Sequence, residues 1–262
     1  MSRNFELLQK AAEARDRDQV VTATAPVAPI SQEPVSQDWI QQAAVSGEGA
    51  PLPRPAEGSS REEMNKLVQR LFAPDGARVV VFSSVERGAG CTWLAAQVAQ
   101  TLASQGRSSV CVVDANFRTP ALHEIFGTNN QPGLSDVALD GGRVQDYLRN
   151  TALPNLWLLT NGTPERAEQA VIASQPLLEC IHQLRTQFEF VIIDAAPMNL
   201  FNDAITLASA GDGIALVLKA NSSRREIAQK MLQEAKAANV RVLGAVLNQR
   251  QFPVPESVYR RL

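Results

Sequence analysis

Hydrophobic runs alternate with helical periodicity over most of the chain after residue 60. Val, Ile and Leu form short runs without polar alternation, which is typical of strands buried on both faces of a parallel sheet. The predicted strands are 78–83, 109–114, 156–160, 190–194, 213–219 and 240–248, and the predicted helices are 92–104, 175–187 and 223–238. This alternation predicts a doubly wound α/β fold with a mostly parallel sheet, which binds ligands at the carboxyl ends of its strands.

One more helix is predicted ahead of the first strand. Ser60 and Glu63 fit a capping box, and apolar residues then recur at helical spacing as far as Leu71, before Pro74 ends the run. We therefore expect the folded domain to span residues 61–262.

Residues 1–60 have a different composition. Six prolines lie between positions 26 and 55 among Ala, Ser, Gln and Gly, which predicts a flexible linker over residues 21–58. Residues 2–17 can place apolar side chains on one face of a short helix, but an isolated helix of this length is marginal in water. A frayed tail and a docking helix are both compatible with this pattern.

Composition narrows the class of protein. The chain has 262 residues, 45% of them hydrophobic, and a net charge of −2, so electrostatics give no reason to expect nucleic-acid binding. The longest apolar stretches are far shorter than the roughly 20 residues that cross a bilayer, and the N-terminus lacks the pattern of a secretory signal. Three scattered cysteines do not suggest a disulfide framework or a zinc site. We expect a reduced, cytoplasmic protein.

The segment between the first predicted strand and its helix is the most informative part of the chain. It contains Gly88, Ala89 and Gly90, and a glycine-rich turn before a helix directs backbone N–H groups and the helix dipole at a bound anion. A complete phosphate loop ends in Lys followed by Ser or Thr. Here Cys91 occupies the lysine position and Thr92 the hydroxyl position. A plain turn that binds no ligand is the alternative.

Two acidic residues close other predicted strands. Asp114 and Asp194 each follow a buried apolar run, and a carboxylate at such a strand end can hold Mg²⁺ beside a phosphate loop together with the hydroxyl of Thr92. Asn248, at the end of the last predicted strand, is a candidate to contact a nucleotide base. Each of these three strand-end residues could instead serve only as a cap or turn residue.

In combination, these motifs resemble the P-loop domain of bacterial tyrosine kinases (BY-kinases), which belong with the MinD and ParA-like ATPases. The resemblance extends from residue 78 to residue 248 and includes the glycine loop, a Walker A′ motif at 113–120 (VDANFRTP), the segments 122–127 (LHEIFG) and 133–136 (GLSD), and a Walker B motif at 191–197 (VIIDAAP). It implies ATP or ADP and Mg²⁺ as ligands. It also implies a role in exopolysaccharide or capsule synthesis.

The chain departs from the family pattern at several positions. Besides Cys91, the second acidic position of the Walker A′ motif is Asn116. The family's oligomerisation motif of Glu and two Arg is only partly kept, as Glu63, Lys66 and Gln69. The C-terminal tyrosine cluster is reduced to Tyr259, which remains the candidate phospho-acceptor.

We expect the loss of the lysine to weaken nucleotide binding moderately and to slow catalysis much more. A charged hydrogen bond is worth roughly 1.5–3 kcal/mol, whereas loss of a preorganised donor costs about 100- to 1,000-fold in rate. A neutral thiol cannot replace the ammonium, and the loop N–H groups would lower the pKa of Cys91 toward an unfavourable thiolate. Arg87, Arg118 or an arginine from a neighbouring subunit could supply the charge. A solvated loop arginine is the alternative for Arg87.

The sequence thus supports three functional hypotheses. The first is a weakly active or inactive BY-kinase homologue that acts as a nucleotide-responsive regulator or scaffold, with Asp114, Asp194 and Arg87 as its catalytic candidates. The second is an active autokinase that uses Arg87 and Tyr259. The third is a MinD or ParA-like positioning ATPase. The resemblance implies a membrane chain-length regulator or related kinase as partner, a possible homo-oligomer, and contact with the inner membrane only through a partner.

Overall fold

The computed structural model describes residues 50–54, 59–73, 76–106, 108–163 and 174–250. The predicted helix at 2–17, most of the expected linker and Tyr259 lie outside these residues. Within them, no helix is both long and apolar enough to cross a bilayer.

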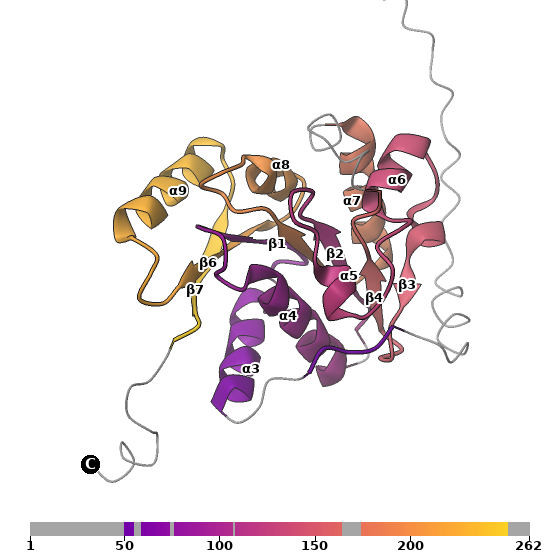
Figure 1. Cartoon of the computed structure of the whole chain (residues 1–262), viewed down its shortest axis with the longest axis horizontal. Helices are drawn as coiled ribbons and strands as arrows, with labels where there is room; N and C mark the ends of the chain where they lie inside the picture. Colours follow the sequence, from indigo (N-terminus) through magenta and orange to yellow (C-terminus); the bar gives the residue numbers. More distant parts are fainter. Residues whose placement is uncertain (1–49, 55–58, 74–75, 107, 164–173, 251–262) are drawn as a thin grey trace, which may run out of the picture. The chain divides into compact units, whose positions relative to one another are not determined.

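A seven-stranded sheet forms the centre of the described fold (Figure 1). Its strands are β1 (Val79–Ser84), β2 (Val110–Ala115), β3 (Arg149–Asn150), β4 (Leu156–Leu159), β5 (Phe190–Ala195), β6 (Gly213–Lys219) and β7 (Val242–Asn248). Their spatial order is β3-β4-β2-β5-β1-β6-β7, and every neighbouring pair is parallel except β3 with β4. The chain therefore has the mostly parallel, doubly wound sheet that its hydrophobic pattern predicts.

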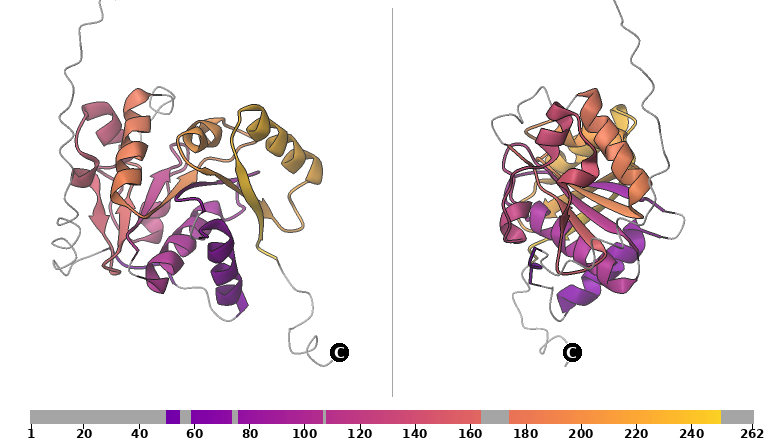
Figure 2. Two further views of the ribbon diagram at one scale, coloured as in Figure 1. Left: turned by 180° about the vertical axis from the view of Figure 1, so that it is seen from behind. Right: turned by 90° about the vertical axis from the view of Figure 1, so that its right-hand side faces the viewer.

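Helices cover both faces of the sheet, as Figure 2 shows from behind and from the side. They are α3 (Ser59–Leu71), α4 (Cys91–Gln105), α5 (Leu122–Ile125), α6 (Leu134–Asp140), the 3₁₀ helix η1 (Val144–Tyr147), α7 (Gln175–Gln187), α8 (Asp203–Ser209) and α9 (Arg225–Ala237). One apolar core contains residues of α3, α4 and α5, and the other contains residues of α6, α7, α8 and α9. Strand β1 serves both, because Val79 and Val81 pack into one core and Val80 and Phe82 into the other.

The predicted strands and helices within the described residues are confirmed, with ends that shift by at most two residues. The expected capping box is wrong, because α3 begins at Ser59 and Ser60 therefore lies inside its first turn. Sequence analysis did not predict β3, α5, α6, η1 or α8. Each spans seven residues or fewer, which is too short for a periodic pattern to stand out.

Residues 50–54 fall within the expected linker but pack on the domain. Ala50 forms a parallel bridge with Thr151, and the backbone carbonyl of Arg54 accepts a hydrogen bond from Nε2 of Gln97 at 2.8 Å. Pro53 is buried. The flexible linker expected over residues 21–58 therefore does not include this segment, whose backbone pairs beside the short edge strand β3.

Candidate nucleotide site

The glycine-rich turn joins the buried end of β1 to the first turn of α4. Gly88 and Gly90 have φ of +76° and +77°, a left-handed conformation that glycine adopts without a Cβ penalty. Gly90 directly precedes α4, and its carbonyl accepts the first helical hydrogen bond, from Leu94 N at 3.0 Å. The N–H groups of residues 91–93 have no partner within the helix. The turn therefore has the local geometry of an anion site.

Neighbouring elements hold the beginning of this turn. The N–H group of Val85 donates to the carbonyl of Val217 in β6 at 3.1 Å. Glu86 accepts a hydrogen bond from the Ser223 hydroxyl at 2.8 Å, and that hydroxyl accepts one from Lys219 N at 2.8 Å. These contacts fix the turn against the end of β6.

Asp114 and Asp194 lie side by side at the carboxyl ends of two paired strands. They are partners in the parallel register of β2 and β5, and both are completely buried. The hydroxyl of Thr92, in the first turn of α4, donates to Oδ2 of Asp194 at 2.7 Å. The fold thus brings together the three residues predicted to hold Mg²⁺, although they are distant in sequence.

The two carboxylates differ in their hydrogen bonding. Asp114 accepts from the backbone N–H groups of Asn116, Ala121 and Leu122 at 2.9–3.1 Å, so it also fixes the turn that leads into α5. Oδ1 of Asp194 is buried and has no hydrogen-bond partner among the described residues. A buried carboxylate oxygen without a donor is suited to a cation.

Burial raises the pKa of both carboxyl groups, and the charge of Asp114 raises the pKa of Asp194 further. The backbone N–H groups that Asp114 binds partly oppose this shift. Two adjacent buried carboxylates favour a proton or a cation between them. No group of three or more His, Cys, Asp and Glu residues suited to a metal occurs in the described ranges. Two carboxylates, one hydroxyl and nucleotide phosphates match the sparse protein ligation that Mg²⁺ prefers.

Cys91 occupies the lysine position with a buried, uncharged side chain. Desolvation raises the pKa of its thiol well above the usual value, and the neighbouring Asp194 carboxylate raises it further. The expected lowering of this pKa by the loop N–H groups is therefore wrong, because burial and a like charge outweigh them. The position carries neither the ammonium of a complete loop nor a thiolate.

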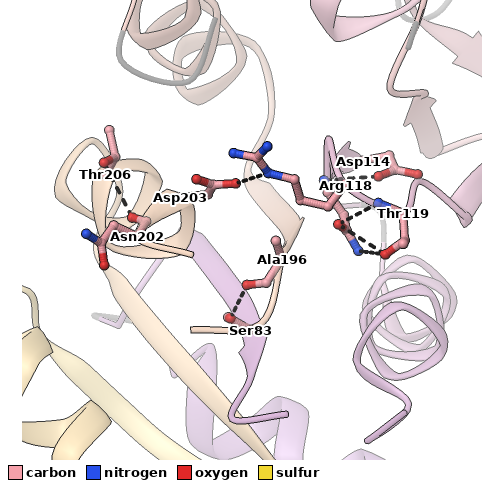
Figure 3. A network of polar contacts seen from close by, with 9 residues as sticks. Ser83, Asp114, Arg118, Thr119, Ala196, Asn202, Asp203 and Thr206 are labelled. Carbon is pink, nitrogen blue, oxygen red and sulfur yellow. Dashed lines mark hydrogen bonds and ion pairs between the residues drawn. The ribbon is translucent and has the colours of Figure 1, made fainter. Parts of the chain in front are cut away.

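Arg87 and Arg118, the two candidates to replace the charge of the missing lysine, do not lie at the position of Cys91. Arg87 is exposed in the turn. The guanidinium of Arg118 lies 4.5 Å from the ring centre of Phe201, and its Nε donates to Asp203 at 3.4 Å (Figure 3). Arg118 therefore links the turn after β2 to α8, at the same end of the sheet as Asp114.

Asn248, the residue predicted to contact a nucleotide base, also contacts the glycine-rich turn. Nδ2 of Asn248 donates to the carbonyl of Ala89 at 2.8 Å, and Nε2 of Gln249 donates to the carbonyl of Gly88 at 3.0 Å. Contact of Asn248 with a base remains a prediction. Sequence reasoning missed Gln249, and its adjacency to Asn248 was the only available signal.

Asn116 and Asp136, which lie in two segments that resemble the family motifs, each accept hydrogen bonds from nearby residues. Asn116, at the second acidic position of the Walker A′ motif, accepts from the backbone of Thr119 at 3.2 Å. Asp136 accepts from Gly133 N at 2.9 Å and from the hydroxyl of Thr163 at 2.7 Å. Asp136 therefore joins the start of α6 to the segment after β4.

The comparisons with known proteins agree with this geometry. No protein-family model matches the chain. It is 28% identical over 187 residues to a putative tyrosine-protein kinase CapB of Staphylococcus aureus, covering 71% of this chain and 82% of CapB. It is 24% identical over 189 residues to a putative tyrosine-protein kinase EpsB of a Ralstonia nicotianae strain, covering 72% of this chain but only 25% of EpsB.

Two solved structures have a similar fold. The chimerical protein CapA2B2 superposes with a TM-score of 0.69 at 26% identity, over 82% of this chain and 99% of that one. The MinD protein of Pyrococcus horikoshii, complexed with Mg-ADP, superposes with a TM-score of 0.57 at 24% identity, over 70% of this chain and 76% of that one. The sheet order, the glycine turn and the paired aspartates define a P-loop NTPase fold of the MinD and ParA type. Within that class, the chain is similar in sequence and fold to tyrosine-protein kinases of the BY-kinase type, such as CapB and the CapA2B2 chimera.

Proposed function

We propose that this chain binds ATP or ADP with Mg²⁺ but transfers phosphoryl groups slowly or not at all, and acts as a nucleotide-responsive regulator or scaffold in exopolysaccharide or capsule assembly. The single observation that carries the proposal is the neutral, buried thiol of Cys91 beside an otherwise complete Thr92, Asp114 and Asp194 arrangement. A cation is missing where charge develops during transfer, while the anion cradle and metal ligands remain.

Each remaining part of the site has a role in binding. The turn and the first residues of α4, from Gly88 to Thr92, would receive the phosphates on their N–H groups. Thr92, Asp114 and Asp194 would hold Mg²⁺, which would screen phosphate charge when bound. Asn248 can present its side-chain oxygen to a base while its amide nitrogen donates to Ala89.

Isothermal titration with Mg-ATP, followed by a turnover assay on the same sample, tests this function. We expect binding with little release of ADP or phosphate. Turnover as fast as that of a BY-kinase with an intact loop lysine, measured in parallel, would contradict the loss of catalysis. Absence of any binding at millimolar Mg-ATP would contradict the nucleotide-responsive role.

An active tyrosine autokinase is the second candidate, favoured by the kinase names of the relatives and by the exposed Arg87 in the turn. In this case the hydroxyl oxygen of Tyr259 would attack the γ-phosphorus of ATP, lose its proton to solvent and release ADP. Incubation with labelled ATP should then label the native chain but not Tyr259→Phe. Absence of label on the native chain rejects this candidate.

The partner proposal follows from the family. We infer that residues 1–60 contact a membrane chain-length regulator of polysaccharide assembly or a related kinase, and that any membrane association occurs through this partner. The proposal is supported by the BY-kinase resemblance, and a second copy of the chain is a further candidate partner. Full-length chain and a chain lacking residues 1–49 should be compared as baits. Equal recovery of polysaccharide-assembly components by both would contradict a role for the N-terminal segment.

A further inference from the structure

The end of β7 is tied to the phosphate loop by two consecutive side-chain amides. Asn248 donates to the carbonyl of Ala89 at 2.8 Å and Gln249 to the carbonyl of Gly88 at 3.0 Å. We propose that these two side chains, here termed the amide latch, are positioning residues that hold the loop's N–H groups ready for an anion. The inference rests on the proposed nucleotide binding and extends it to a mechanism for organising the loop.

Peptide geometry explains how the latch acts at a distance from the ligand. In a trans peptide the carbonyl of one residue and the N–H of the next point in opposite directions. Fixing the carbonyls of Gly88 and Ala89 toward β7 therefore turns the N–H groups of Ala89 and Gly90 away from β7. Successive N–H groups fixed on one side of a turn form the concave site that binds phosphate.

The hydrogen bond from Asn248 to the loop requires a glycine at position 90. A Cβ at this position would lie 2.7 Å from Nδ2 of Asn248, closer than non-bonded atoms approach. Gly88 has a similar left-handed φ, but a Cβ there would meet nothing within 4 Å. The two glycines thus differ: both allow the backbone turn, and Gly90 also makes room for Asn248.

Gln249 has a backbone conformation that needs support. Its φ of +56° lies in the left-handed region that non-glycine residues rarely adopt. Its side chain is exposed and makes its hydrogen bond to the loop. The strained residue therefore lies at the contact that joins β7 to the loop, and local strain of this kind persists when surrounding contacts hold it.

We expect the latch to contribute more to phosphate affinity in this chain than it would in a chain that has the loop lysine. Because a cysteine stands at position 91 in place of the loop lysine, the backbone N–H groups and Mg²⁺ would have to supply most of the attraction for phosphate. Losing one neutral hydrogen bond weakens an interaction by about 3- to 10-fold. We expect a loss of that size in anion affinity for each latch residue removed.

Two binding probes separate the latch from recognition of the base. Mg-ADP and inorganic tripolyphosphate should be titrated into the native chain, Asn248→Ala, Gln249→Ala and Gln249→Gly. Tripolyphosphate has no base, so loss of Gln249 should weaken both ligands to a similar extent. Loss of Asn248 should weaken tripolyphosphate by the same amount and ADP by more, because the proposed base contact is lost as well. The Gln249→Gly variant removes the amide but accepts the left-handed φ, so it separates loss of the side chain from backbone strain. Gln175→Ala, which removes an exposed amide from α7, is the matched control.

A measurement without ligand tests the latch separately. Arg87 is exposed and immediately precedes Gly88, so trypsin cleavage after Arg87 reports the mobility of the loop. Cleavage after Arg143, exposed ahead of η1, serves as the internal reference. We expect both Gln249 variants to be cleaved faster after Arg87 than the native chain, with Gln175→Ala unchanged.

The outcomes distinguish the two proposals. Faster cleavage after Arg87, with equal weakening of ADP and tripolyphosphate binding in the Gln249 variants and weaker tripolyphosphate binding in Asn248→Ala, supports the latch. Unchanged cleavage, native-like behaviour of Gln249→Gly, or an effect of Asn248→Ala on ADP alone overturns it. If the native chain binds neither ligand, the proposed function fails, and the cleavage comparison in the ligand-free chain still decides whether the latch exists.

Discussion

The hydroxyl of Thr92 donates a hydrogen bond to Asp194 across 2.7 Å, and so joins the first turn of α4 to the end of β5. The same carboxylate lies beside Asp114 in the register of β5 with β2. This contact connects the phosphate loop to the paired carboxylates. Several consequences of that arrangement can be measured.

Replacement of Cys91 by lysine should restore nucleotide affinity. The ammonium would add a charged hydrogen bond to phosphate, so ATP should bind about 10- to 100-fold more tightly than to the native chain. Cys91→Ala removes the thiol without adding charge and is the matched control, expected to bind within about threefold of native. Isothermal titration measures both. Equal affinity of the lysine and alanine variants would show that the loop does not present this position to phosphate.

The paired carboxylates should make stability depend on pH. Because burial raises the folded-state pKa of Asp194 above its ordinary value of 3.8, the folded state holds its proton more tightly than the unfolded state. The free energy of unfolding should therefore fall as pH rises from about 4 through the raised pKa, and Asp194→Asn should reduce that slope. Urea titrations of the ligand-free chain across this range check the prediction.

A control separates this effect from general charge effects. Asp146 is exposed, and its side chain lies 3.3 Å from Arg143. Asp146→Asn should leave the slope in pH close to native. If Asp194→Asn and Asp146→Asn behave alike, the raised pKa of the buried carboxyl group is wrong.

Gly162 should not tolerate a side chain. Its φ is +99°, and a Cβ would lie 2.4 Å from Oγ of Ser135 and 2.5 Å from Oδ2 of Asp136. Backbone strain and overpacking together predict that Gly162→Ala lowers the free energy of unfolding by about 2–4 kcal/mol. Gly141 also has a left-handed φ, but a Cβ there meets nothing within 4 Å. Gly141→Ala should therefore cost about 1 kcal/mol, and equal losses in urea denaturation would contradict the packing argument.

The cysteines should react slowly in the folded chain. Cys91, Cys111 and Cys180 are all buried, and burial raises the pKa of each thiol. A thiolate is the reactive species, so an aromatic disulfide reagent at pH 8 should label none of them rapidly until denaturant is added. Fast labelling of one thiol per native chain, lost in Cys91→Ala, would show that the phosphate loop opens to solvent.

Much of the fold could be predicted because its strands carry a local signal. Strand β6 at Gly213–Lys219 and helix α7 at Gln175–Gln187 match the predicted bounds, because an uninterrupted apolar run or a helical repeat is visible within the segment itself. Strand β3 has two residues and depends on pairing with β4. Helix α8 has seven residues, which is too few to establish a repeat.

The sequence alone determined the order of the longer strands and helices, the glycine turn and the acidic residue at the end of two strands. Tertiary structure decided that Asp114 and Asp194 lie side by side, that the thiol of Cys91 is buried near a carboxylate, and that Gln249 reaches the carbonyl of Gly88. Periodicity and turn chemistry depend on neighbouring residues, whereas register, burial and electrostatic environment depend on residues far apart in the chain that only packing brings together.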